Sequence, residues 1–134
     1  NGVREIRLVN RNQIKARKLA DDLLGPIEVC DWSDRTAVLS GTRLLINTTS
    51  LGMINQDPLE INLKYLPINA IVNDIVYTPT QTTPLRSAQE RGNPTVDGLG
   101  MLLHQARLGF LAWFGVDPKV SSALKTHVLA AMKT

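Results

Sequence analysis

The order of the apolar segments restricts the fold of this chain more than any other feature. Short runs rich in branched aliphatic residues alternate with longer segments whose apolar residues recur at helical spacing. The predicted strands cover 3–9, 27–30, 44–46, 70–77 and 95–97, and the predicted helices cover 13–24, 83–91, 100–114 and 122–133. Strands that alternate with helices at these lengths predict an α/β fold with a parallel sheet.

Residues at the segment boundaries support this division. Asn12 is a predicted cap for the first helix, which Gly25-Pro26 is expected to stop. Ser121 or Ser122 is expected to cap the last helix. The continuous apolar run Leu44-Leu45-Ile46 is typical of a strand buried on both faces of a parallel sheet.

One piece of a dinucleotide-binding sheet is missing from the sequence. Such a sheet normally begins with a strand, a glycine-rich turn and a helix whose N-terminus binds the pyrophosphate. No G-x-G-x-x-G motif occurs, because Gly98 and Gly100 lack the third glycine, and the chain opens without Met. We therefore expect a fragment with a Rossmann-like doubly wound parallel sheet that lacks its first strand and glycine-rich turn, plus two C-terminal helices.

Composition excludes several classes of function. No apolar run approaches membrane-spanning length, so no membrane partner is expected. Cys30 is the single cysteine, which rules out an internal disulfide and fits a reducing cytoplasm. His104 and His127 have no evident carboxylate partner, so neither a metal site nor a catalytic triad is predicted.

The positive charge is concentrated at one end of the chain. The net charge is +3, yet six of the 15 basic residues fall within the first 18 positions. Aromatic residues make up 4% of the chain, too few for the stacking surfaces of single-strand nucleic-acid binders. We therefore expect a local anion site and no nucleic-acid partner.

Asn10-Arg11-Asn12 is the candidate for that site, because it closes the first predicted strand. At the end of the second strand of a doubly wound sheet, an acidic residue binds the ribose of NAD, whereas a basic one accommodates the 2′-phosphate of NADP. A planar guanidinium matches phosphate geometry, and Lys15 follows closely. These residues favour NADP, although a solvated basic turn would have the same composition.

Further polar residues follow the later strands. Asn47-Thr48-Thr49-Ser50 and Gly98 come directly after predicted strands, and Tyr77 ends one. These residues should therefore line one edge of the sheet, where open α/β sheets bind ligands. Alternatives stay open at each position. For 47–50 the alternative is a polar turn that satisfies its own backbone. For Tyr77 it is a half-buried core tyrosine, and for Gly98 it is a helix-entry turn. Taken alone, Gln105 is more typical of a solvated helix residue than of a binding residue.

Four motifs occur together in order, and their combination resembles the shikimate dehydrogenase family. They are Asn10-Arg11, Asn47-Thr48-Thr49-Ser50-Leu51-Gly52-Met53, Asp74-Ile75-Val76-Tyr77-Thr78-Pro79, and Val96-Asp97-Gly98-Leu99-Gly100-Met101-Leu102-Leu103-His104-Gln105-Ala106. The resemblance covers nearly the whole chain. It implies an NADP-binding domain over 1–100 and C-terminal helices over 101–134 that would pack toward a catalytic domain absent here.

The resemblance also implies residue roles. The cofactor-binding positions are Asn10, Arg11, Asn12, Lys15, Thr48, Ser50, Ile75, Gly98 and Met101, and the substrate-binding positions are Tyr77 and Gln105. Asn12 stands where the family usually has Thr. The family's catalytic lysine and aspartate belong to its other domain, so no catalytic residue is expected in this fragment.

The implied reaction is the reversible NADPH-dependent reduction of 3-dehydroshikimate to shikimate, a small-molecule substrate of aromatic amino acid biosynthesis. Two alternatives remain. One is a quinate/shikimate dehydrogenase that uses both cofactors, which an acidic residue after Arg11 would have favoured. The other is a non-catalytic nucleotide-binding domain. The oligomeric state is open, with a homodimer as one option.

Overall fold

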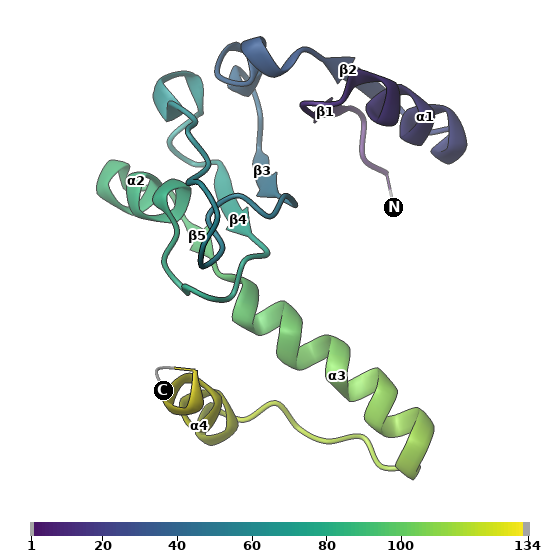
Figure 1. The fold of residues 1–134 in the computed structure, drawn as a ribbon, viewed down its shortest axis with the longest axis vertical. Coiled ribbons are helices and arrows are strands. Elements are labelled where there is room, and N and C mark those ends of the chain that lie inside the picture. The colour runs from purple at the N-terminus through teal and green to yellow at the C-terminus, as the bar shows by residue number, and fades with distance from the viewer. Residues whose placement is uncertain (1, 133–134) are drawn as a thin grey trace. The chain divides into compact units, whose positions relative to one another are not determined.

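The computed structural model describes residues 2–132. Contacts group them into two compact units, one formed by 2–42 with 61–67 and the other by 43–60 with 68–132. Both units combine parallel strands with helices (Figure 1), as an α/β fold requires. The predicted fold class is therefore confirmed.

The first unit contains one strand–helix–strand crossover. Its strands β1 (Ile6–Val9) and β2 (Ile27–Cys30) pair in parallel, with Ile6 opposite Ile27 and Val9 opposite Cys30. Helix α1 (Gln13–Leu23) connects them and contacts both. Three short 3-10 turns complete the unit, at Trp32–Asp34, Ala37–Leu39 and Leu63–Tyr65.

The two ends of α1 are capped in different ways. The Asn12 side chain accepts a hydrogen bond from the backbone amide of Lys15, which confirms the predicted cap. At the other end, Leu24 and not Gly25 takes the left-handed conformation, with φ of 49°. The prediction that Gly25 stops the helix is therefore wrong by one residue. Leu24 is 91% exposed, so little packing compensates for its backbone conformation.

The second unit contains a three-stranded parallel sheet. Its strands are β3 (Leu44–Asn47), β4 (Ile71–Asp74) and β5 (Thr95–Val96), in the order β3-β4-β5. Helix α2 (Thr83–Arg91) links β4 to β5 and contacts both. Helices α3 (Gly98–Phe114) and α4 (Ser122–Ala131) follow, and Ser121 caps α4 as predicted.

Several strands are shorter than the sequence predicts. β4 ends at Asp74, so residues 75–77 form a loop, and β5 ends before Asp97. The reason is that both aspartates accept hydrogen bonds from backbone amides two residues later, from Val76 and Leu99. Such local bonds turn the chain away from the sheet. Asp97 consequently caps α3, which begins two residues earlier than expected.

The three-stranded sheet is covered on one face. Val72 and Asp74 are fully buried on the face that α2 covers, together with Leu85 and Ala88 of that helix. The opposite face carries exposed aliphatic side chains, which are Leu44 (49% exposed), Ile46, Ile71 and Val96. The prediction that Leu44-Leu45-Ile46 is buried on both faces is therefore wrong for this structure, because no described element covers that second face.

The strand orders match the two flanks of a dinucleotide-binding sheet. In the order 3-2-1-4-5-6, the first strand separates strand 2 from strand 4. β1 pairs with β2 and β3 pairs with β4, and no other strand in residues 2–132 pairs with β1 or β3. This pattern agrees with the predicted sheet that lacks its first strand.

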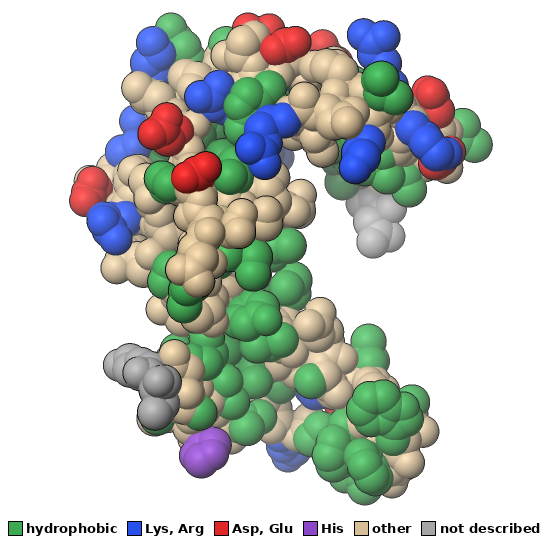
Figure 2. Space-filling view, viewed as in Figure 1, with side chains coloured by type: hydrophobic (Ala, Val, Ile, Leu, Met, Phe, Trp, Pro, Cys, Tyr) green, Lys and Arg blue, Asp and Glu red, His purple; other side chains and the backbone are tan. Residues whose placement is uncertain are grey.

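Helix α3 carries many exposed apolar side chains toward its C-terminal end, where Figure 2 shows hydrophobic side chains gathered. They include Leu108 (73% exposed), Trp113 (79%) and Phe114 (64%). No helix in the described residues has both the length and the apolar character needed to cross a membrane.

Replacing Leu24 by glycine should stabilise the protein. Because Leu24 is exposed and left-handed, Leu24→Gly should raise the free energy of unfolding by about 0.5–1 kcal/mol in urea denaturation. The control Arg17→Gly lies inside α1 with an ordinary backbone and should lower it by about 1 kcal/mol. A similar loss from both variants would contradict the role assigned to Leu24.

Candidate functional site

The turn after β1 brings together Asn10, Arg11, Asn12 and Lys15. The Asn10 side-chain oxygen accepts from the Asn12 amide at 2.8 Å, and the Asn12 oxygen accepts from the Lys15 amide at 3.0 Å. Both carboxamide oxygens therefore fold the turn and start the helix. Arg11 and Lys15 are thereby held at the carboxyl end of β1 and the N-terminus of α1.

The Arg11 side chain is exposed and forms no hydrogen bond or ion pair with any residue in 2–132. Two other cations of this unit are engaged. Arg7 donates to Glu5 at 2.6 Å and to two backbone carbonyls, and Lys18 pairs with Asp22 at 2.9 Å. Arg11 is therefore available to an anion, at a helix N-terminus whose backbone dipole also favours negative charge.

The acidic residue that follows β2 forms hydrogen bonds within its own turn. Asp31 accepts hydrogen bonds from the backbone and the hydroxyl of Ser33, both at 2.8 Å, and these bonds lower the pKa of its carboxyl group. The neighbouring Cys30 shows the opposite trend, because burial raises the pKa of its thiol. A thiol with a raised pKa is a weak nucleophile, which agrees with a structural role for Cys30.

In the second unit, the loop after β3 divides its residues between two tasks. Asn47 is buried, and its oxygen accepts from the Thr49 amide (3.0 Å) and the Thr49 hydroxyl (2.8 Å). The Thr49 oxygen in turn accepts from the Leu51 amide. Asn47 and Thr49 therefore form the self-satisfied polar turn that was the alternative interpretation of this segment.

Thr48 and Ser50 behave differently. Both are exposed, and neither hydroxyl makes a hydrogen bond to another residue of the described chain. The loop thus folds through alternate side chains and leaves the other two hydroxyls available. These two are the positions predicted to bind the cofactor.

Asp74 lies at the centre of this unit and is fully buried. Its Oδ1 atom accepts from Asn47 Nδ2 and from the Val76 amide, both at 3.0 Å, and its Oδ2 atom accepts from the Thr82 hydroxyl at 2.6 Å. One carboxyl group therefore joins the end of β3, the loop after β4 and the start of α2.

The loop after β4 carries Ile75 and Tyr77. The Ile75 amide donates to the Asn47 carbonyl, and the Thr78 carbonyl accepts from the Ile54 amide. Tyr77 is 37% exposed, and its hydroxyl has no partner among residues 2–132. Tyr77 is therefore a half-exposed residue with a free hydroxyl, unlike a core tyrosine with a satisfied one.

Gly98 begins α3 in close contact with the same loop. A Cβ atom at this position would lie 2.2 Å from the Ile75 carbonyl oxygen and 2.7 Å from that of Val76. A backbone cannot give way as a flexible side chain can, so this position requires glycine for the chain's own packing. The predicted contact of Gly98 with a cofactor remains a prediction, and its lack of a side chain has this separate explanation.

Met101 and Gln105 lie four residues apart on α3 and therefore share one side of the helix. Met101 is 40% exposed, and Gln105 and His104 are exposed too. Thr48, Ser50, Ile75, Tyr77 and Gly98 all lie at the carboxyl ends of β3, β4 and β5, as predicted. The residues of the Asn10–Lys15 turn belong to the other unit.

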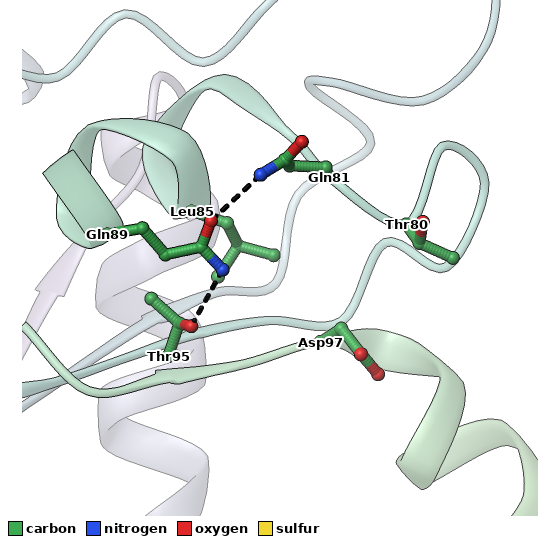
Figure 3. Close-up of a pocket in the computed structure, with 6 residues that line it drawn as sticks. All are labelled: Thr80, Gln81, Leu85, Gln89, Thr95 and Asp97. Atoms are coloured by element: carbon green, nitrogen blue, oxygen red, sulfur yellow. Dashed lines mark hydrogen bonds between the residues drawn. The ribbon is translucent and has the colours of Figure 1, made fainter.

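The second unit has an open, polar pocket of about 290 Å³ next to β5 (Figure 3). It is lined by Thr80, Gln81, Leu85, Gln89, Thr95 and Asp97. Gln81 donates to Gln89 at 2.8 Å, and Gln89 donates to the Thr95 hydroxyl at 3.1 Å. Both glutamine side chains of the pocket are therefore hydrogen-bonded within its wall. Sequence reasoning assigned no role to these residues.

Sequence reasoning also missed Asp74, Asn47 and Thr82 as a network, although it quoted the motifs that contain two of them. The signal was present, since Asp74 is a charged residue in an apolar run and buried charges need partners. Within residues 2–132, no group of three or more His, Cys, Asp or Glu residues could hold a metal ion.

The parallel strands, crossover helices and polar strand ends define a Rossmann-like α/β protein. Comparison with known proteins makes this specific. The chain is 55% identical to the NADP(+) shikimate dehydrogenase of Paramagnetospirillum magneticum over 129 residues, and 50% identical to that of Rhodospirillum rubrum over 132 residues. In each case 96% of this chain aligns with 47% of the relative.

This chain is therefore homologous to shikimate dehydrogenases, which confirms the resemblance seen in its motifs. It spans about half the length of the curated relatives it matches. No family model matches it.

Solved structures agree on the fold. Quinate dehydrogenase from Corynebacterium glutamicum in complex with NAD has a TM-score of 0.84 at 27% identity, covering 96% of this chain and 47% of that one. Shikimate 5-dehydrogenase from Thermus thermophilus in complex with NADP(H) and shikimate has a TM-score of 0.72 at 27% identity, covering 96% and 45%.

The contact between Gly98 and Ile75 gives a direct test of this geometry. Gly98→Ala should lower the free energy of unfolding by at least about 2 kcal/mol, because the added methyl group overlaps backbone atoms. Gly100→Ala is the matched control in the same helix turn. Nothing lies within 4 Å of its Cβ position, so it should be neutral or stabilising by up to about 1 kcal/mol. Equal effects in urea denaturation would refute the close approach.

Proposed function

We propose that this chain is the NADP-binding part of a shikimate dehydrogenase, which interconverts 3-dehydroshikimate and shikimate. The observation that carries the proposal is Arg11, unpartnered among the described residues at the carboxyl end of β1, in a chain 55% identical to an NADP(+) shikimate dehydrogenase. An exposed guanidinium at this strand end suits a 2′-phosphate, and it cannot accept hydrogen bonds from the ribose hydroxyls as an acid does.

The residues of the turn fit this group. Asn10 and Asn12 use their oxygens internally, which leaves their amide hydrogens as donors for phosphate or ribose oxygens. Lys15 adds a second cation in the first turn of α1, four positions after Arg11 in the sequence. No acidic residue interrupts the segment 6–20. The local charge is therefore positive, as a phosphorylated dinucleotide requires.

Residues at the ends of the later strands are proposed to hold the remainder of the cofactor and the substrate. The hydroxyls of Thr48 and Ser50 have no hydrogen-bond partner among the described residues, so both are available to a ligand. The Ile75 amide is already bonded to Asn47, so its carbonyl is the group left to accept a hydrogen bond from the cofactor. Tyr77 and Gln105 offer a hydroxyl and a carboxamide to a polyhydroxylated ring acid.

When bound, NADPH supplies the hydride of this reaction. The chain's own contribution is binding and orientation, since the resemblance assigns the catalytic lysine and aspartate to the part of the relatives outside this chain. We propose the division at residue 100 on the same basis, with α3 and α4 packing toward that other part. The exposed apolar side chains of α3, among them Leu108 and Trp113, support this assignment.

Quinate dehydrogenase activity is the second candidate, favoured by the structural likeness to the Corynebacterium glutamicum enzyme. Asn12 argues against it, because the residue after Arg11 is not an acid that would bind the ribose of NAD. Measuring the turnover of shikimate and of quinate, each with NADP and with NAD, distinguishes the two candidate activities. We also propose a cytoplasmic location, which the single Cys30 fits, and leave a homodimer as an untested option.

Arg11 should govern cofactor choice. In the full-length protein, Arg11→Ala should raise the KM for NADPH by roughly tenfold or more, since hydrogen bonds to charged groups contribute about 1.5–3 kcal/mol. The KM for NADH should change little, so the preference between the cofactors narrows. Arg17→Ala removes another exposed α1 cation and should leave both values nearly unchanged. Equal losses with both cofactors after Arg11→Ala would contradict a 2′-phosphate site.

Gln105 should affect the other ligand. Gln105→Ala should raise the KM for shikimate several-fold, because a neutral hydrogen bond contributes about 1 kcal/mol, and should leave the Kd of NADP nearly unchanged. Replacing the adjacent exposed His104 by alanine is the control and should alter neither value. A loss of NADP affinity in Gln105→Ala would show that this side of α3 faces the cofactor instead.

A further inference from the structure

The buried carboxyl group of Asp74 determines where the loop after β4 lies. Its Oδ1 atom holds the Val76 amide, the residue directly before Tyr77, at 3.0 Å. The same oxygen accepts from Asn47 Nδ2, which fixes it against the end of β3. Its Oδ2 atom accepts from the Thr82 hydroxyl at 2.6 Å. Both carboxyl oxygens are therefore occupied by donors from three separate segments.

Other contacts immobilise the same loop from its remaining sides. The Ile75 amide bonds to the Asn47 carbonyl, and the Thr78 carbonyl bonds to the Ile54 amide. The Ile75 and Val76 carbonyls lie against Gly98 at the start of α3. Val76 is buried, whereas Tyr77 is half exposed. Tyr77 is thus the side chain that this fixed loop presents to solvent.

We propose that Asp74, held by Thr82, is a positioning residue that places the Tyr77 hydroxyl for substrate binding. The inference rests on the proposed function, which makes Tyr77 a contact to shikimate. Asp74 itself is fully buried, so it acts through the loop and does not touch the substrate. Thr82 acts one step further away, by fixing the orientation of the carboxyl group.

Thr82 is the best point at which to disturb this network. It stands at the N-cap position of α2, but its side chain forms no capping hydrogen bond, so its hydroxyl serves Asp74. Thr82→Val removes the hydroxyl and keeps the shape of the side chain. Thr82→Ser keeps the hydroxyl. The adjacent Thr83 is exposed and has no hydrogen-bond partner among residues 2–132, so Thr83→Val is a matched control.

The experiment measures kcat/KM for shikimate at saturating NADP in the full-length protein. Thr82→Val should lower it about tenfold, because a shift of the Tyr77 hydroxyl by a fraction of an ångström weakens its contact with the substrate. Thr82→Ser should restore most of the activity, and Thr83→Val should match the unchanged protein. Thermal unfolding of each variant establishes that the assays contain folded protein.

A double-mutant cycle with Tyr77→Phe separates positioning from a general structural role. If Asp74 acts through the Tyr77 hydroxyl, Thr82→Val should have little further effect once that hydroxyl is absent, so the two losses are non-additive. A purely structural defect would lower kcat/KM by the same factor in both backgrounds. Additive losses, or an unchanged kcat/KM in Thr82→Val, would overturn the inference.

The failure of the proposed function has a different signature. If Tyr77→Phe alone left kcat/KM for shikimate unchanged, Tyr77 would not bind the substrate, and the inference would fall together with that assignment. If Tyr77→Phe lowered kcat/KM while Thr82→Val did not, the substrate role of Tyr77 would stand and the positioning role of Asp74 alone would be wrong.

Discussion

A carboxyl group in the protein interior is costly unless hydrogen bonds replace its hydration, and the second unit is organised around that requirement. Asp74 is fully buried, and each of its oxygens has a donor. Those donors come from β3, the loop after β4 and the start of α2, so satisfying one side chain fixes three segments. No buried side-chain nitrogen or oxygen in the described residues lacks a partner. The polar network is therefore complete, which is the condition under which such networks specify one arrangement.

The same division of labour recurs at the ends of the strands. One set of polar side chains folds each loop, and a neighbouring set remains free. Asn10 and Asn12 shape the turn that presents Arg11, and Asn47 and Thr49 shape the loop that presents Thr48 and Ser50. Because the folding bonds are internal, the exposed groups are placed without being consumed. This arrangement suits a protein that binds a ligand with several charged and hydroxylated parts.

The sequence predicted the elements well where local chemistry decides them. The bounds of α2 and the cap at Asn12 follow from residues within a few positions. The prediction failed where the local structure depends on residues far away in the sequence, or on the absence of a covering element. Nothing local indicates that Leu24, and not Gly25, takes the left-handed conformation, or that Leu44 and Ile46 are exposed on an uncovered face. The candidate site residues were predicted from motif resemblance, whereas the Asp74 network required knowing which strands are neighbours. A charged residue inside an apolar run was the available clue.

We propose that the turn after β1 binds the 2′-phosphate of NADP. A crystal structure of the full-length protein with NADP and shikimate tests it most directly, through the distance between the Arg11 guanidinium and that phosphate. The account predicts a charge-assisted hydrogen bond of about 2.7–2.9 Å. A 2′-phosphate held by other cations, with Arg11 still directed into solvent, would contradict it.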